Sequence, residues 1–196
     1  MNALAIFDLD DTLIDTQGVL LLPALRRVAA IVGVDVDRLN HRGKAIDEVL
    51  EPLAALPADL RERAAEAWYD PTVPALDPLP GAREMLDMLR GRIHLALLTR
   101  GNPARQQAKI DSCGLRDAFA AIRIRVIEEA GTKRDDILAL AREFDVSLAR
   151  TVVIGDDPHD EILHARALGC PVLPVPENAL SDIPSRLADL GLVVPH

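Results

Sequence analysis

Three carboxylates, those of Asp8, Asp10 and Asp11, come directly after the apolar run Leu4–Phe7 in the stretch "LAIFDLDDT". Like charges that are crowded at the end of a buried strand repel one another and resist desolvation. A bound cation or a reacting group would relieve that strain. The stretch therefore predicts a functional site at the carboxyl end of this strand.

Other chemically active side chains stand at comparable places along the chain. Thr99 follows the apolar run Ile93–Leu98, Lys133 opens a helical pattern, and Asp156 follows the apolar run Thr151–Ile154. In a parallel sheet, ligands bind beyond the carboxyl ends of the strands. We therefore expect these groups and the N-terminal aspartates to converge on one edge of the fold.

The residue types at this edge suit phosphoryl transfer. Asp8 and Asp156, together with a backbone carbonyl, make an oxygen-rich site for Mg²⁺. A carboxylate beside that ion can attack phosphorus, because the metal also neutralises the phosphoryl oxygens. Thr99, backbone amides at the next helix start and Lys133 would hold the remaining oxygens. A second carboxyl two residues along the chain, Asp10, can protonate the leaving oxygen and then activate water.

The elements that must position these groups alternate between strand and helix. Short apolar runs of strand length recur at Leu4–Phe7, Ile93–Leu98, Ala121–Ile127, Thr151–Ile154 and Pro171–Val175. The stretch "NPARQQAKIDSCG" predicts a helix with Asn102 as its N-cap, Pro103 at its first position and Gly114 at its end. Strands that alternate with helices from residue 80 onward imply an α/β fold with a doubly wound, parallel, Rossmann-like sheet.

Residues 17–78 break this alternation, because they carry only helical patterns and close with the proline-rich stretch "DPTVPALDPLPG". We interpret them as a helical insertion between the first strand and the rest of the sheet. The predicted domains are therefore an α/β core, residues 1–16 and 79–196, and a helical insertion, residues 17–78.

Four stretches, "FDLDDT", "LLTRGN", "GTKRDD" and "VVIGDDPHDE", together resemble the four ordered motifs of the haloacid dehalogenase-like (HAD) hydrolase superfamily. The resemblance covers the predicted core, and the insertion sits where this family carries its C1 helical cap. It implies that Asp8 is the nucleophile, that Asp10 is the general acid/base, and that Lys133 stabilises an aspartyl-phosphate. Within the family, the stretch that begins with Thr99 looks most like the phosphatase branch, with its nucleotidase-like and sugar-phosphatase-like members.

The same resemblance implies two binding sets. The substrate phosphate would be held by Thr99, Arg100, Gly101 and Lys133. The Mg²⁺ cofactor would be held by Asp8, the Asp10 carbonyl and Asp156, with Asp160 as a further ligand or an anchor behind the ligands.

Two positions depart from the family pattern. Arg100 stands where the family often has Asn or Ser, and it matters for substrate preference only if its side chain is used. Asp157 stands where the family often has Ser or Thr, so it could tighten Mg²⁺ binding, repel an anionic substrate or only cap a helix. Thr12 has two interpretations of equal weight, a turn-closing hydroxyl and a direct part in the site.

The leading prediction is an enzyme, a Mg²⁺-dependent phosphomonoester hydrolase that acts on a small phosphorylated metabolite of the nucleotide or sugar phosphate class. A phosphomutase of the same family would use the same Asp8 and Asp10, and a non-catalytic phosphate-binding protein is a further alternative. Dehalogenation fits less well, because carbon–halogen chemistry has no alkoxide for Asp10 to protonate. A receiver-type signalling domain would be shorter and would lack the insertion.

Composition limits the remaining classes. The formal charge of −9 gives no general attraction to nucleic acid or an anionic membrane, so neither is an expected partner. Cys113 and Cys170 form no CxxC pair, and we expect two reduced, buried thiols. The N-terminal stretch does not resemble a signal peptide, and no run approaches the ~20 apolar residues of a membrane-spanning helix. These features predict a cytoplasmic protein, either monomer or homodimer.

Overall fold

The structure is a computed structural model that describes residues 2–41, 45–53, 56–70, 72–126, 131–175 and 180–193. The chain divides into two compact units, one formed by Met1–Asp15 with Val73–His196 and the other by Thr16–Thr72. Within the described ranges, every helix is too short or not apolar enough to span a membrane.

The first unit is built on a parallel sheet that has the strand order β3-β2-β1-β4-β5 in the part of the chain that is described. Its strands are β1 (Leu4–Phe7), β2 (His94–Arg100), β3 (Ala121–Arg125), β4 (Thr151–Gly155) and β5 (Val172–Pro174). The central strand β1 is buried along its whole length and pairs with β2 on one side and β4 on the other. The predicted parallel α/β fold is therefore confirmed.

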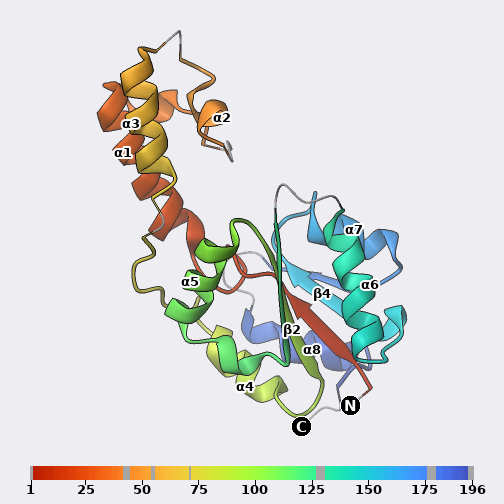
Figure 1. Cartoon of the computed structure of the whole chain (residues 1–196). Helices are drawn as coiled ribbons and strands as arrows, with labels where there is room; N and C mark the ends of the chain where they lie inside the picture. Colours follow the sequence, from red (N-terminus) through yellow and green to blue (C-terminus); the bar gives the residue numbers. More distant parts are fainter. Residues whose placement is uncertain are drawn as a thin grey trace. The chain divides into compact units, whose positions relative to one another are not determined.

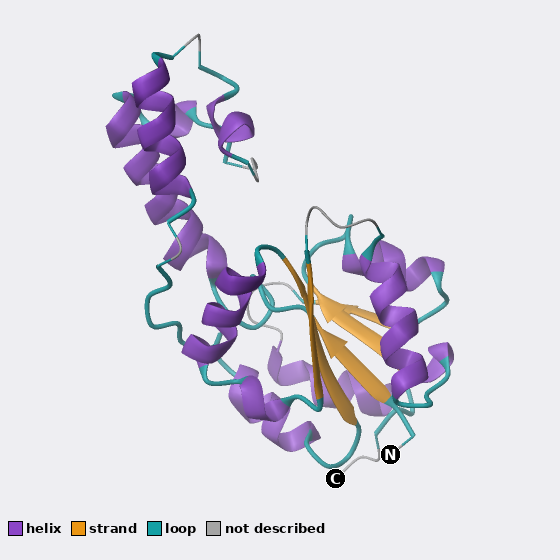
Figure 2. Cartoon of the chain, in the orientation of Figure 1, coloured by secondary structure: helices purple, strands orange, loops and turns teal. Residues whose placement is uncertain are grey.

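Helices cover both faces of this sheet (Figures 1 and 2). They are α4 (Ala82–Leu89), α5 (Pro103–Cys113), α6 (Lys133–Glu143), α7 (Glu161–Ala167) and α8 (Ile183–Asp189), with short 3₁₀ turns η3 (Arg116–Ala118), η4 (Leu148–Arg150) and η5 (Leu180–Asp182). In Figure 1, α6 and α7 lie on one face, and α4 and α5 lie on the other.

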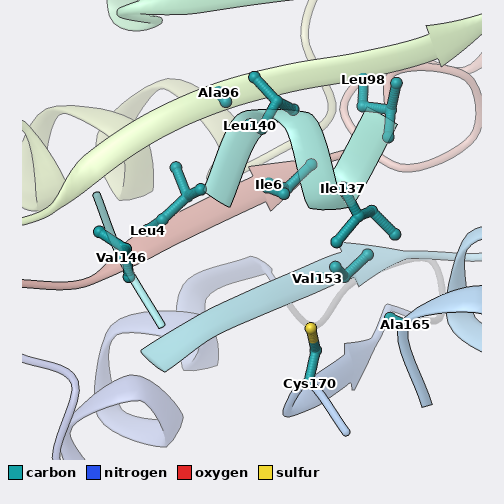
Figure 3. Close-up of a cluster of buried hydrophobic side chains, with 10 residues drawn as sticks. All are labelled: Leu4, Ile6, Ala96, Leu98, Ile137, Leu140, Val146, Val153, Ala165 and Cys170. Carbon is teal, nitrogen blue, oxygen red and sulfur yellow. The ribbon is translucent and has the colours of Figure 1, made fainter. Parts of the chain in front are cut away.

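A hydrophobic cluster fixes α6 and α7 to the sheet (Figure 3). Leu4 and Ile6 of β1 point to the same face because side chains alternate along a strand, and they meet Ile137 and Leu140 of α6. Ala165 of α7 belongs to the same cluster. Burying side chains of this size stabilises the fold by roughly 1.5–3 kcal/mol each. The cluster therefore holds the first residues of α6 and α7 firmly at the edge of the sheet.

Local sequence signals set where α5 begins and ends. The Asn102 side chain accepts a hydrogen bond from the Arg105 amide at 3.1 Å, and Pro103 occupies the first helical position. Gly114 ends the helix in the left-handed conformation, at φ 64°, which glycine adopts without strain. The predicted start and end of this helix are confirmed.

The second unit is helical in all its described elements. They are the π-helical turn η1 (Gln17–Leu21), α1 (Leu22–Val32), the 3₁₀ turn η2 (Val36–Arg38), α2 (Ile46–Leu50) and α3 (Ala58–Trp68). Helices α1 and α3 pack against each other around a core that includes Leu25, Val28, Val49 and Trp68. The unit therefore has a hydrophobic core of its own.

The second unit ends at Thr72, whereas the sequence pattern extends the insertion over residues 17–78. The difference has a local cause. Leu76 is buried, and Pro78 forms a β-bridge with Ile14, so this returning segment is grouped with the first unit.

Candidate active site at the carboxyl edge of the sheet

Asp8 is the first residue after β1, and its carboxylate is buried. Its amide donates to the Ile154 carbonyl of β4 at 2.9 Å, which fixes the backbone at this position. Lys133 is the first residue of α6, where the Asp135 carboxylate caps the helix by accepting from the Thr132 amide at 2.9 Å. From there the Lys133 Nζ reaches the Asp8 Oδ1 at 2.7 Å, and the ion pair is almost fully buried.

Asp8 belongs to a cluster of acidic groups. Oxygen atoms of Asp8, Asp156 and Glu161 all lie within 4.8 Å of one another. Asp156 follows β4, and the almost fully buried Glu161 opens α7. One oxygen of Glu161 accepts from Lys133 Nζ at 2.7 Å, and the other accepts from the Asp157 amide at 2.8 Å. Carboxylate oxygens from three residues suit a hard divalent cation, so the residues fit the implied metal.

Of the acidic residues after β4, Asp156 and Glu161 belong to the cluster, and Asp160 lies beside it. Asp160 Oδ2 lies 3.6 Å from Lys133 Nζ, and its Oδ1 lies 3.7 Å from His164 Nε2. Among the described residues it is Glu161, one position further on, that completes the cluster with Asp8 and Asp156. The sequence reasoning missed Glu161, and a role for Asp160 in metal binding stays a prediction.

The cluster has the electrostatic strain that the sequence suggests. The pKa of Asp8 is raised to about 8, because burial and the charges of Glu161 and Asp10 together outweigh the lowering effect of Lys133. Burial likewise raises the pKa of Asp156 to about 6. Burial disfavours the charge of Lys133, but the surrounding carboxylates raise its pKa above the ordinary lysine range. The site therefore holds more negative charge than Lys133 alone neutralises.

Asp10, the second aspartate of the motif, faces α5. Its Oδ1 accepts from Lys109 Nζ at 2.7 Å, and its Oδ2 accepts from Gln106 Nε2 at 2.8 Å. Gln106 Nε2 also lies 2.6 Å from the Thr99 hydroxyl, which is buried in β2. Sequence reasoning assigned no role to Gln106 or Lys109, although both are buried polar residues on a helix that it predicted.

Strand β2 runs through Thr99 to Arg100, so it continues past the predicted end at Leu98. Arg100 is exposed, and Gly101 is buried. The Gly101 amide donates to the Arg125 carbonyl of β3 at 2.9 Å, and this bond continues the β2–β3 pairing. The backbone around Gly101 is thus held by the sheet, and contacts of Arg100 and Gly101 with a phosphate stay predictions.

Thr12 and Asp157 support the segments around the site. The Thr12 hydroxyl donates to Asp156 Oδ1 at 2.8 Å, so this residue orients a member of the acidic cluster. Asp157 Oδ1 accepts from the His159 amide at 2.8 Å and organises the turn that leads into α7.

Gly155, the last residue of β4, gives a test of the Glu161 position. A Cβ at Gly155 would lie 2.3 Å from Glu161 Oε1 and 2.6 Å from its Cγ, closer than atoms can approach. Since Lys133 and the Asp157 amide hold Glu161, we expect Gly155→Ala to cost about 1–3 kcal/mol of unfolding free energy and to weaken divalent cation binding. Denaturant unfolding and Mg²⁺ titration measure the two effects. Unchanged stability and cation binding would mean that Glu161 is free to move.

Fold and site together define an α/β enzyme of the doubly wound parallel type, with an aspartate-centred site at the carboxyl edge of its sheet. The model of the haloacid dehalogenase-like hydrolase family matches residues 3–169, and the chain belongs to this family. This is the family that the four motifs resemble.

Two relatives and one solved structure illustrate the similarity. The chain is 30% identical to the pyrimidine 5'-nucleotidase YjjG of Escherichia coli over 102 residues, which are 50% of this chain and 44% of the nucleotidase. It is 28% identical to the glyceraldehyde 3-phosphate phosphatase of Pyrococcus abyssi over 182 residues, 83% of this chain and 76% of that protein. A haloacid dehalogenase-like family hydrolase from Xanthomonas campestris shares the fold with a TM-score of 0.73 at 22% identity, covering 96% of both chains. The aligned region thus spans less than half of the nucleotidase.

Proposed function

We propose that this chain is a Mg²⁺-dependent phosphomonoester hydrolase that works through an aspartyl-phosphate on Asp8. The buried Asp8–Lys133 pair within the acidic cluster carries the proposal. It places a carboxylate nucleophile beside a fixed positive charge, at the sheet edge where ligands bind in this type of fold.

In the first half of the proposed reaction, an Asp8 carboxylate oxygen attacks the phosphorus of the ester. A bond forms between Asp8 and phosphorus, and the bond from phosphorus to the alcohol oxygen breaks. Asp10, two residues further along, gives its proton to the departing oxygen, so a neutral alcohol leaves. Lys133 stabilises the negative charge on the transferring group together with Thr99, Arg100 and Gly101.

In the second half, water attacks the phosphorus of the aspartyl-phosphate. Asp10 takes a proton from that water, the bond between phosphorus and the Asp8 oxygen breaks, and inorganic phosphate leaves. Asp8 is thereby regenerated as a carboxylate and Asp10 as an acid, so the cycle closes.

Asp8, Asp156 and Glu161 would hold the Mg²⁺ ion, together with the Asp10 carbonyl that the family resemblance implies. When bound, the ion would neutralise the carboxylates and polarise the phosphoryl oxygens. The carboxylate donor set supports this choice of cation over a soft metal.

The proposed substrates are small phosphorylated metabolites of the nucleotide or sugar phosphate class. The activities named for two relatives, a nucleotidase and a triose phosphate phosphatase, support this range. We also propose that the helical insertion acts as a cap that selects the leaving group, as its place in the sequence predicts.

Phosphate release from a panel of esters tests the proposal. The panel contains nucleoside monophosphates, sugar phosphates, a triose phosphate and p-nitrophenyl phosphate, each with Mg²⁺ and with EDTA. Release that depends on Mg²⁺ is the expected result. Conversion of a sugar phosphate to its isomer without phosphate release would instead identify a mutase, and the absence of any reaction would favour a binding protein.

The raised pKa values predict how Mg²⁺ binding depends on pH. In the folded, metal-free protein the pKa of Asp8 is about 8 and that of Asp156 about 6, both above the ordinary 3.8. The two carboxyl groups therefore contribute their full stabilisation at pH values below the ordinary pKa of 3.8. This stabilisation is lost as the pH rises through their raised pKa values. Mg²⁺ competes with these protons, so we expect it to raise the melting temperature more at about pH 8 than at about pH 5. Equal shifts at both pH values, measured by thermal unfolding, would contradict the predicted ligand set.

A further inference from the structure

Two polar side chains of α5 are buried against the candidate active site. Gln106 and Lys109 are 2% and 6% exposed, and they stand three positions apart, so they share one face of the helix. An ammonium group and an amide resist burial unless polar partners replace water. They donate hydrogen bonds to Asp10, in the candidate site.

Together these side chains fix both oxygens of the Asp10 carboxylate. Lys109 Nζ donates to Oδ1 at 2.7 Å, and Gln106 Nε2 donates to Oδ2 at 2.8 Å. A carboxylate that is held at both oxygens cannot rotate about its side-chain bond without losing a hydrogen bond. The Asp10 side chain is nevertheless 26% exposed, so it is held and still accessible to a substrate.

Gln106 also connects Asp10 to the end of β2. Its Nε2 lies 2.6 Å from the Thr99 hydroxyl and 3.0 Å from the Arg100 carbonyl, in addition to Asp10. An amide nitrogen has two hydrogens for these three acceptors, so the acceptors share them. A Cβ at Gly101 would lie 3.0 Å from Gln106 Cγ, so the glycine leaves room for this arrangement.

We propose that Lys109 and Gln106 are positioning residues that set the direction of the Asp10 carboxyl group, which in its protonated form transfers a proton to the leaving oxygen, and this rests on the proposed function. General acid catalysis needs the acid within hydrogen-bond distance of the oxygen, about 2.6–3.2 Å. A misplacement of about 1 Å can cost on the order of 10²-fold in rate. The pair also couples Asp10 to Thr99, the predicted phosphate-binding hydroxyl.

The leaving group distinguishes this role from a structural one. A nitrophenolate departs without a proton, whereas an alkoxide needs one from Asp10. We compare kcat/KM for p-nitrophenyl phosphate and for an alkyl phosphate from the substrate panel, because this ratio reports the steps up to alcohol release and not the later hydrolysis. We expect Lys109→Met and Gln106→Met to lower the value for the alkyl ester by about 10- to 100-fold, and that for the nitrophenyl ester by no more than about 3-fold.

Two further variants serve as controls. Gln107 is the neighbour of Gln106 on α5, and its side chain donates to Asp111 at 2.9 Å. We therefore expect Gln107→Met to leave kcat/KM unchanged for both esters. Lys109→Arg keeps the donor and should recover part of the alkyl-ester activity that Lys109→Met loses. Equal losses for the two esters, or no loss for either, would overturn the proposal.

A measurement without substrate separates this proposal from the proposed function. Thermal unfolding of Asp10→Asn, of Lys109→Met and of the double variant forms a double-mutant cycle. If the ion pair between Asp10 and Lys109 exists in solution, the two substitutions should have non-additive effects on the melting temperature. Additive effects would overturn the proposal. Coupling in a protein that hydrolyses no ester would refute the phosphatase and, with it, the role of the pair in proton transfer.

Discussion

Turnover of the Asp8→Asn variant is expected to fall by ~10³-fold or more, because the carboxamide has no anionic oxygen to attack phosphorus. The two side chains have the same size, and an amide oxygen can still accept a hydrogen bond from Lys133. The loss should therefore be chemical and not structural. Steady-state phosphate release with the best ester of the panel measures it, and turnover near that of the original protein would refute Asp8 as the nucleophile.

The stability of the Asp8→Asn variant gives an independent check. Since burial raises the pKa of Asp8 to about 8, its charged form is disfavoured in the metal-free protein. The neutral variant should therefore be at least as stable as the original in EDTA, and it should gain less stability from Mg²⁺. Asp145→Asn is a matched control, because Asp145 adopts a left-handed conformation that asparagine accepts, and it lies just before η4 and the amino end of β4. This control should keep its turnover.

The sheet could be predicted from the sequence because its strands are short apolar runs between clear helix signals. Strand β1 occupies the predicted residues, and β4 extends one residue beyond its prediction. The end of β2 was less evident, because the polar residues Thr99 and Arg100 follow an apolar run and still pair with β3. Pairing with a neighbouring strand, which a local pattern does not contain, decides where such a strand stops.

The site also combines features that the local sequence predicts with features that only the packing of the folded chain decides. Asp8, Asp156 and Lys133 could be predicted to converge, because parallel strands and the helices that follow them share one edge of the sheet. Glu161 could not be chosen over Asp160, because successive residues on a helix point about 100° apart and the first residue of α7 decides which one faces inward. In the sequence, Gln106 and Lys109 of α5 have the pattern of a solvent-exposed helix face. Their burial follows from the contact with the Asp10 carboxylate, which only the folded structure shows.

Removal of the Lys133 charge is expected to have the second large effect. Lys133 Nζ lies 2.7 Å from both Asp8 and Glu161 and 3.6 Å from Asp160, and the side chains of all three carboxylates are at most 16% exposed. A buried ion pair that loses one partner typically destabilises a protein by about 3–5 kcal/mol, because the remaining charge has no compensation. We expect Lys133→Met to cost an amount in that range in EDTA, measured by denaturant unfolding, and to lower turnover by at least about 10²-fold.

The origin of that loss can be tested with a second substitution and with the metal. If uncompensated negative charge is the cause, Glu161→Gln should restore part of the stability when it is combined with Lys133→Met, because one carboxylate is then neutral. Mg²⁺ should also stabilise Lys133→Met more than it stabilises the original protein, since it supplies the missing positive charge to the same cluster. Turnover should not return with stability, because the donor beside Asp8 is still absent. A Lys133→Met variant that is as stable in EDTA as the original protein would show that the buried carboxylates are neutral without Lys133.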